Sequence, residues 1–593
     1  MLGAHIPAND THALSVSLPE WIDNVGYVSG EDRVIKAMRT GYPRFFIQPA
    51  VKQLCTHFES TLSDQNERAL IFPNAHIARA FCSFVLLEDS HASVRSVEVC
   101  GRRPLLLDRA SDQLALHVTF VPERLWLRAK QFWQHTGWGM SNRLASVFVN
   151  SLGLGGSSLT SDMSWNGAGE RPRRLLRERI ASWVQQDRSL EAAAGRRLKA
   201  QLLDPSPGDV FLYQSGMAAI WTLHHALLAT REDPAAKSIC FGFGYTDTIK
   251  VLTRWGPGCA FFGHGDHNDL ESLKAGLKGN MSSSSPSQSS SIPLALWCES
   301  PSNPLLRSVD LPELRKVADA HRFPIVVDDT IGNFTNVDNV MGGSVVLNPN
   351  SIFYPMLKEN LTQCYTPELY DTWWFEDAVQ MEANSHGFVA RSATINVRAE
   401  RIADYLHSHS LVKRVYYPKF ETPELYALFR RTSPEAGYGG LMSLTFHTER
   451  AAHAFYDALG CCKGPSLGTE FTLACPYTIL GHWKELEWAA RYGVEEAIVR
   501  ISVGCEDEDV IMGWIETALR AAEVAATCLE TVVISGDSDG SDCELASPSS
   551  SEDLSVSTPE DERPEDELPI PLEKSAEDAV FAVNVLDDIV VHF

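Results

Sequence analysis

The sequence predicts an α/β protein with a mostly parallel β-sheet and a smaller α/β domain on its carboxyl side. Between residues 171 and 395, short apolar segments alternate with helical segments, which is typical of a parallel sheet covered on both faces. The apolar segments are Lys237–Phe241, Leu294–Trp297 and Pro324–Asp328. At 593 residues the chain is too long for one compact core, so we expect more than one domain.

Composition and pattern divide the chain into four regions. We expect an N-terminal extension at residues 1–170, a large domain at 171–395, a small C-terminal domain at 396–523 and a tail at 524–593. A serine-rich loop at residues 281–291 interrupts the large domain. The tail is acidic and rich in Ser, Asp, Glu and Pro, which predicts that it is disordered.

The net charge of −25 lies mainly in the tail. Residues 530–593 hold 18 acidic side chains against Arg563 and Lys574, a charge of −16, which leaves −9 for the remainder. This acidity argues against nucleic-acid binding, which needs basic surface. No apolar run of eighteen residues occurs, so we predict no membrane span. Thirteen cysteines without paired spacing predict free thiols and a cytoplasmic location, and we predict no metal site.

Two segments of the large domain have patterns typical of ligand sites. Tyr213–Ile220 places a Ser-Gly turn at a helix start, where free N–H groups and the helix dipole favour an anion. A helix cap without a ligand explains this segment equally well. Trp297–Pro304 ends an apolar strand in polar residues, which is where α/β sheets place ligands. A structural turn explains its two prolines, although not Glu299 and Asn303 beside them.

Two predicted strands each carry one charged residue. Asp328 ends an apolar strand, and a buried carboxylate needs a cation or several donors, so it suits a protonated pyridine nitrogen. Helix capping by Asp329 or Thr330 is the competing interpretation. Arg500 lies within the β-branched strand Val499–Gly504, and an inward arginine there suits a substrate carboxylate. An internal salt bridge is the alternative for this arginine.

Taken together, these segments resemble the Cys/Met-metabolism enzymes that depend on pyridoxal 5'-phosphate (PLP), and most closely the fungal type of cystathionine gamma-synthase. The resemblance runs from about Ser17 to Glu523. Further matching segments are Thr40–Phe46, Cys240–Asp247, Gly263–Gly265, Gly342–Ser344, Leu411–Lys419 and Gly464–Gly468. The resemblance implies the PLP-dependent transferase fold type I, of the aspartate-aminotransferase kind. It also implies a homodimer or homotetramer whose active sites are built from two subunits.

The resemblance implies roles for residues around the cofactor. Ser215, Gly216 and Met217 would bind the PLP phosphate. Tyr245 would stack on the pyridine ring, and Asp328 would pair with the ring nitrogen. We therefore expect these residues to lie together in the folded chain.

The resemblance also implies a substrate class and a reaction. Asn303, Ser466 and Arg500 would hold the phenolic side of the cofactor and the substrate carboxylate. The implied reaction is a gamma-replacement, in which cysteine displaces the acyl group of an O-acylhomoserine to give cystathionine for methionine biosynthesis. An O-acylhomoserine sulfhydrylase, a gamma-replacement enzyme of another biosynthetic pathway and a non-catalytic interaction protein are the alternatives.

The lysine that forms the Schiff base with PLP in this family has no counterpart here. In the family, a helix, a strand and a Ser-x-x-Lys segment separate the Asp from the Met-Gly-Gly turn. Here Asp328 and Met341 are only 13 positions apart, and no lysine lies between Lys316 and Lys358. Lys316 precedes the Asp, and Lys358 follows the next strand, so Lys358 is the stand-in to consider.

Three explanations account for the missing lysine. The gene model is incomplete, the protein is a pseudoenzyme, or another lysine serves in its place. The absent stretch includes a strand expected within the sheet of the large domain. Its loss should leave unpaired backbone on both neighbouring strands, which favours the first explanation.

Overall fold

The computed structural model describes most of the chain. Its described residues are 1–64, 66–100, 115–155, 170–184, 205–282, 292–332, 337–364, 373–430, 436–527 and 589–592. Residues 1–526 and 583–593 form one compact unit. No helix in these ranges combines the length and the apolarity needed to cross a membrane.

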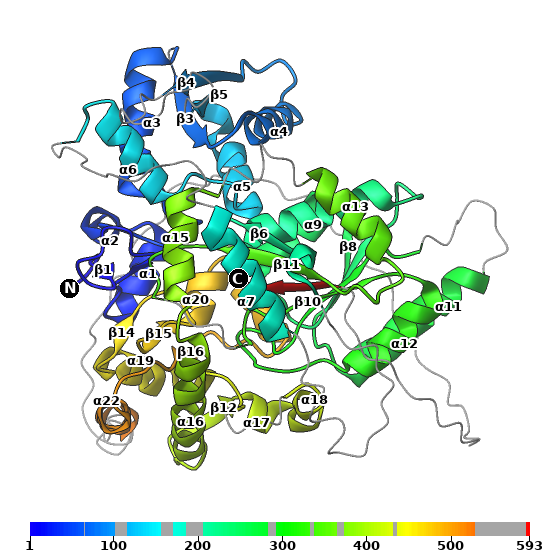
Figure 1. The fold of residues 1–593 in the computed structure, drawn as a ribbon. Coiled ribbons are helices and arrows are strands. Elements are labelled where there is room, and N and C mark those ends of the chain that lie inside the picture. The colour runs from blue at the N-terminus through cyan, green and yellow to red at the C-terminus, as the bar shows by residue number, and fades with distance from the viewer. Residues whose placement is uncertain are drawn as a thin grey trace, which may run out of the picture. The chain divides into compact units, whose positions relative to one another are not determined.

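A seven-stranded sheet forms the centre of the large domain (Figure 1). Its strands, in spatial order, are β6 (Val210–Tyr213), β11 (Gly343–Leu347), β17 (Ile589–His592), β10 (Ile325–Asp328), β9 (Leu296–Glu299), β7 (Ser238–Phe241) and β8 (Cys259–Phe262). β11 runs antiparallel to both of its neighbours, and the other paired strands are parallel. The prediction of a mostly parallel sheet is therefore confirmed.

Helices cover both faces of this sheet. Because successive strand residues point to opposite faces, neighbouring residues of one strand pack against different helices. Val326 belongs to the core that contains α9 (Gly216–Thr230), whereas Val327 belongs to the core under α11 (His267–Ser282) and α12 (Leu311–His321). The other helices of this domain are α7 (Glu170–Val184), α10 (Thr246–Arg254), α13 (Tyr354–Cys364) and α15 (Phe375–Asn384), with the short 3-10 helix η2 (Pro207–Asp209) before β6. Burial on both faces explains why the strands are continuously apolar.

The small domain is a five-stranded sheet with helices packed on it. Its strands, in spatial order, are β12 (Val412–Tyr416), β13 (Leu441–Phe446), β16 (Val499–Ser502), β15 (Leu473–Pro476) and β14 (Cys462–Lys463). Its helices are α16 (Phe388–His407), α17 (Pro418–Glu421), α18 (Pro423–Ala427), α19 (Glu449–Ala458), α20 (Tyr477–His482), α21 (Leu486–Arg491) and α22 (Glu508–Thr527). α16 begins eight residues before the predicted boundary at 396, because Gly387, at φ 69°, starts the helix there.

The N-terminal extension contains a three-stranded antiparallel sheet, in the order β3 (Glu67–Phe72), β5 (Ala115–Pro122) and β4 (Arg95–Cys100). Its helices are α3 (Pro49–Leu62), α4 (Ala75–Leu86), α5 (Trp126–Thr136) and α6 (Asn142–Ser151), with the 3-10 helix η1 (Glu123–Leu125) before α5. α5 also packs on α9, so this region contributes to the same core as the large sheet.

The first residues of the extension pack on the small domain rather than on that sheet. They form β1 (His5–Ile6), β2 (Ser15–Val16), α1 (Trp21–Ser29) and α2 (Asp32–Ala37). The Trp21 ring stacks on His453 of α19 at 4.1 Å, and the Tyr456 hydroxyl donates to the Leu18 carbonyl at 2.7 Å. Residues 1–170 therefore pack partly on the small domain and partly on the core of the large sheet.

The C-terminal tail differs from the sequence expectation at both of its ends. α22 continues to Thr527, and Ile589–His592 form β17 within the large sheet. The expectation of disorder for residues 528–588 and the serine-rich insertion at 283–291 lie outside the described residues. β17 could not be predicted from the sequence, because composition alone does not reveal a strand that is paired over such a distance along the chain.

Candidate active site

The parallel strands bring the predicted site residues to one edge of the large sheet. Ser215 follows β6, Tyr245 follows β7, Glu299 ends β9 and Asp328 ends β10. The carboxyl ends of parallel strands are where α/β proteins bind ligands. These four residues, although far apart in the chain, therefore lie at the same edge of the large sheet.

The Ser215 turn has the geometry of an anion-binding helix start. Ser215 is the N-cap of α9, and its hydroxyl accepts from Ala218 N at 3.1 Å and donates to the Gly137 carbonyl at 3.0 Å. Gly216 and Met217 are the first helical residues, so the helix supplies no acceptor for their N–H groups. A Cβ on Gly343 would lie 2.5 Å from the Ser215 carbonyl oxygen, so only glycine allows β11 to pass so close.

Two buried carboxyl groups lie side by side at the ends of β9 and β10, where Glu299 and Asp328 are register partners. Burial raises the pKa of Asp328 to about 6, although the Thr330 hydroxyl and N–H, which donate to this carboxylate, oppose the rise. Burial and the neighbouring Asp328 raise the pKa of Glu299 well above its usual range. A protonated pyridine nitrogen would supply a cation to this pair.

Glu299 also ties two other predicted residues together. Its carboxylate accepts from the backbone N–H of Tyr245, and its second oxygen accepts from Asn303 N at 3.3 Å. The Asn303 side-chain oxygen lies 3.4 Å from Arg500 Nη1. Glu299 thus links the β7, β9 and β16 parts of the site, a role that the sequence analysis had left unassigned.

Arg44, which the sequence analysis did not single out, closes one side of this site. Its Nη2 donates to the Tyr245 hydroxyl at 2.5 Å and forms an ion pair with Asp247 at 2.6 Å. Its Nη1 is buried and has no hydrogen-bond partner among the residues that the structure describes. The segment Thr40–Phe46 carried family resemblance but no local signal of a site residue, because Arg44 meets Tyr245 and Asp247 across 201 and 203 positions of chain.

Arg500 is buried among neutral groups in the described part of the chain. Its Nη2 donates to the carbonyls of Pro465 and Ser466, at 2.8 and 3.2 Å, and its guanidinium carbon lies 5.1 Å from the centre of the Tyr477 ring. No carboxylate of the described residues pairs with it. A buried guanidinium with only neutral partners is a good receptor for a ligand carboxylate.

Two buried polar atoms around this cluster lack hydrogen-bond partners among the described residues. They are Arg44 Nη1 and Tyr477 Oη. Burial raises the pKa of Asp338 well above its usual range, and the neighbouring Ser466 opposes the rise. Unpartnered donors and acceptors beside an anion-binding turn and a carboxyl pair fit a polar, phosphate-bearing ligand such as PLP.

The structure does not bring Lys358 into this site. Lys358 Nζ contacts the Gly208 carbonyl and lies 2.9 Å from Asp209 Oδ1, at the amino end of β6. Ser215 lies beyond the carboxyl end of that strand, and the four strand residues alone span roughly 13 Å. Lys250 of α10 approaches more closely, since its Nζ lies 3.3 Å from Asp247 Oδ1.

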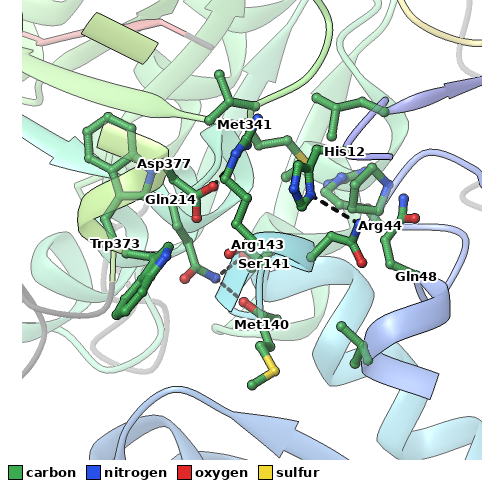
Figure 2. A pocket seen from close by; sticks show the side chains of 18 of the residues that line it. His12, Arg44, Gln48, Met140, Ser141, Arg143, Gln214, Met341, Trp373 and Asp377 are labelled. Atoms are coloured by element: carbon green, nitrogen blue, oxygen red, sulfur yellow. Dashed lines mark hydrogen bonds and ion pairs between the residues drawn. The ribbon is translucent and has the colours of Figure 1, made fainter. Parts of the chain in front are cut away.

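A cavity adjoins the Ser215 turn on the side of the N-terminal extension (Figure 2). Arg44 and Gln48 line one side of it, and Trp373 and Asp377 line the other. Gln214 donates to the carbonyls of Gly137 and Gly139, at 2.9 and 2.6 Å, and so fixes the loop between α5 and α6 over the turn.

No group of three or more His, Cys, Asp or Glu side chains in the described ranges could hold a metal ion. All nine cysteines whose state the structure describes are free thiols, as the sequence predicted. The polar groups that the described residues bring together here are the Ser215 turn, the Glu299–Asp328 pair and the two buried arginines, Arg44 and Arg500.

The fold and the site together define a PLP-dependent enzyme class. The chain belongs to the Cys/Met metabolism PLP-dependent enzyme family, whose model matches residues 206–343 and 386–520. The N-terminal domain model of the fungal trans-sulfuration enzymes matches residues 50–141. The predicted family, fold type and cofactor are confirmed.

The chain is similar to curated proteins over most of its length and over nearly all of theirs. The chain is 37% identical to the cystathionine gamma-synthase-like enzyme iboG2 of Amanita muscaria, over 88% of this chain and 97% of that protein. It is 35% identical to the cystathionine gamma-synthase of Neurospora crassa, over 88% and 98%. It is 30% identical to the alanine racemase ungC of Aspergillus violaceofuscus, over 88% and 96%. A solved cystathionine gamma synthase of Xanthomonas oryzae pv. oryzae is 21% identical, with a TM-score of 0.46, over 62% of this chain and 90% of that chain.

Proposed function

We propose that this chain binds PLP and the carboxylate of an amino-acid substrate at the edge formed by Ser215, Tyr245, Asp328 and Arg500. The observation that carries this proposal is the burial of Arg500 among neutral groups, because a guanidinium so placed favours an incoming carboxylate. Within the family, the reaction that fits best is the replacement of the acyl group of an O-acylhomoserine by cysteine.

Each residue has a distinct role in this proposal. Ser215, Gly216 and Met217 hold the phosphate with a hydroxyl and helix N–H groups. Tyr245 stacks on the ring, and Asp328 pairs with the ring nitrogen and thereby keeps the ring electron-withdrawing. When bound, PLP supplies an electron sink for carbanion chemistry at the substrate.

Asn303, Ser466 and Arg500 orient the phenolic side of the cofactor and the substrate carboxylate. Arg44, which bonds to the Tyr245 hydroxyl, holds that ring in place from the N-terminal side.

We further propose that this chain holds PLP without a covalent link and is catalytically impaired. No lysine occurs between Lys316 and Lys358, and the contacts of Lys358 with Asp209 keep it at the other end of β6. Catalytic groups need placement within about 0.5 Å, which Lys358 does not meet. Whether the intact gene encodes further residues before Met341 is answered by sequencing the transcript across that junction.

The test is the absorption spectrum of the purified chain with PLP, before and after borohydride treatment. We expect saturable PLP binding, measured by equilibrium dialysis, and no PLP bound to the protein covalently after borohydride and denaturation. A covalent PLP adduct, mapped by mass spectrometry to Lys250, Lys358 or another lysine, would show that the chain forms a Schiff base after all. Absence of saturable binding would contradict the proposed site itself.

We also propose that the protein acts as a homodimer or homotetramer in the cytoplasm. Its family membership and its free thiols support this assignment. Light scattering of the purified chain measures the oligomer, and a monomer that binds PLP fully would contradict the requirement for two subunits.

A further inference from the structure

β17 lies between two strands that are near neighbours in the chain. β10 ends at Asp328 and β11 begins at Gly343, whereas β17 comes more than 240 positions later (Figure 1). On the β10 side, the parallel register pairs Val326 with Ile589, Val327 with Val590 and Asp328 with Val591. On the β11 side, the antiparallel register pairs Ser344, Val345, Val346 and Leu347 with His592, Val591, Val590 and Ile589.

Without β17, the large sheet would divide into two pieces. Among the described strands, β9 would be the only remaining partner of β10, and β6 the only one of β11. Both strands are deeply buried, and Val326 and Val345 are 0% exposed. Backbone N–H and C=O groups left unpaired in such surroundings are rare, because they lose water without gaining a protein partner. β17 therefore fills a slot that the rest of the fold leaves open.

The sequence of β17 suits this slot. Its first three residues, Ile589-Val-Val591, repeat the Ile325-Val-Val327 of the parallel strand beside it. β-branched residues favour strands, and a continuously apolar run suits a strand covered on both faces. α9, the helix that begins at the Ser215 turn, packs against β17.

We propose that the gap between β10 and β11 is a strand-accepting site, and that residues 589–592 of the same chain occupy it. The 61 residues between Thr527 and Ile589 reach at most about 200 Å when extended, so the connection permits this insertion within one chain. The carboxyl end of β17 lies at the ligand edge, since Val591 pairs with Asp328 and His592 with Ser344. The inserted strand thus sets the spacing between Asp328 and the Gly343 turn that packs on Ser215.

Hydrogen–deuterium exchange of the unmodified chain tests the insertion directly. We expect slow amide exchange in residues 589–592, comparable with that in β10 and β11 and well below that of an unstructured peptide. Exchange of residues 589–592 at the rate of an unstructured peptide would by itself overturn the proposal.

Proline substitution tests whether β10 and β11 depend on β17 for their slow amide exchange. Val591→Pro removes a backbone N–H in the middle of the ladder, and Val556→Pro makes the same change in the acidic tail. We expect Val591→Pro to speed exchange in residues 326–328 and 344–347 by about tenfold or more, with β7 and β8 unchanged. Equal exchange of residues 326–328 and 344–347 in the Val591→Pro and Val556→Pro variants would overturn the proposal.

A peptide added in trans separates loss of the strand from general unfolding. The peptide carries residues 583–593 and is added to the full-length Val591→Pro chain. We expect this peptide to restore slow exchange in β10 and β11 saturably, and the same peptide with Val591→Pro to fail. Equal effects of both peptides would overturn the proposal.

Discussion

The guanidinium of Arg44 and the carboxylate of Asp247 form a buried ion pair, with Nη2 and Oδ2 2.6 Å apart and side chains 4% and 0% exposed. Burial opposes both charges, but Arg44 and Lys250 lower the pKa of Asp247, and Tyr245 and Asp247 raise that of Arg44. The N-terminal segment is thereby fixed beside the ring that is proposed to stack on the cofactor. Arg44, in the N-terminal extension, therefore lies beside the proposed cofactor site.

Removal of Arg44 alone should cost far more stability than removal of the pair. We expect Arg44→Met to lower the free energy of unfolding by about 3–5 kcal/mol, because it leaves Asp247 buried without its main cation. Arg44→Met with Asp247→Leu should lose less. Lys36→Met, which breaks the exposed pair with Asp32, is the control and should cost within about 1 kcal/mol. Urea unfolding measures the free energy of unfolding of all three variants. Equal losses in Arg44→Met and Lys36→Met would contradict the prediction.

Gly137 should not tolerate a side chain. It has a φ of 66°, and an added Cβ would lie 2.4 Å from Ser215 Oγ and 2.8 Å from Ala218 N. We expect Gly137→Ala to destabilise the protein by about 1–3 kcal/mol and to weaken PLP binding, because it displaces the phosphate turn. Gly276→Ala, in an exposed turn of α11 with open space around it, should instead stabilise by up to about 1 kcal/mol. A PLP affinity unchanged by Gly137→Ala would refute the link to the turn.

Asp328→Asn should stabilise the PLP-free chain in a pH-dependent way. The pKa of Asp328 is about 6 in the folded chain, above its ordinary value of about 4, so the folded state holds the proton more tightly. The wild type therefore loses stability as pH rises from about 4 to about 6, by up to about 3 kcal/mol, and the asparagine variant avoids that loss. Urea unfolding across this range should show the difference growing and then levelling off. A difference that does not change with pH would contradict the assignment, and PLP affinity should fall in the variant.

Arg500→Lys should weaken substrate binding and leave PLP binding intact. Lysine keeps the charge but loses the planar, two-point contact with a carboxylate. We expect the affinity for an O-acylhomoserine, measured by calorimetry on the PLP-loaded chain, to fall about tenfold or more. The corresponding carboxamide serves as the control ligand, because its binding should not distinguish the two proteins. Equal affinity of wild type and variant for the carboxylate would exclude Arg500 as its receptor.

Lys358→Gln should leave PLP binding unchanged. The substitution removes the ion pair with Asp209, which is partly exposed on the lysine side, and should cost about 1 kcal/mol of stability. Equilibrium dialysis with PLP should give the same affinity as the wild type. A clear loss of PLP binding with an intact fold would mean that Lys358 reaches the cofactor.

Much of the site could be predicted from local patterns. Apolar strands that end in polar residues placed Glu299 and Asp328 at a ligand edge, and the Ser-Gly turn placed Ser215 at a helix start. Arg44 could not be found in this way, because its surrounding segment has no periodicity or charge pattern that indicates burial. Its role depends on Tyr245 and Asp247, which approach it only after the chain has folded.

The sequence by itself determined the family, the parallel sheet of the large domain and the absence of a lysine between Lys316 and Lys358. Those features follow from residue type and spacing, which are local properties. The tertiary structure alone decided how the sheet is completed, because the backbone of β10 and β11 accepts whichever strand can pair with both. Ile589-Val-Val591 meets that requirement through long-range hydrogen bonding, and no local pattern encodes such a partner.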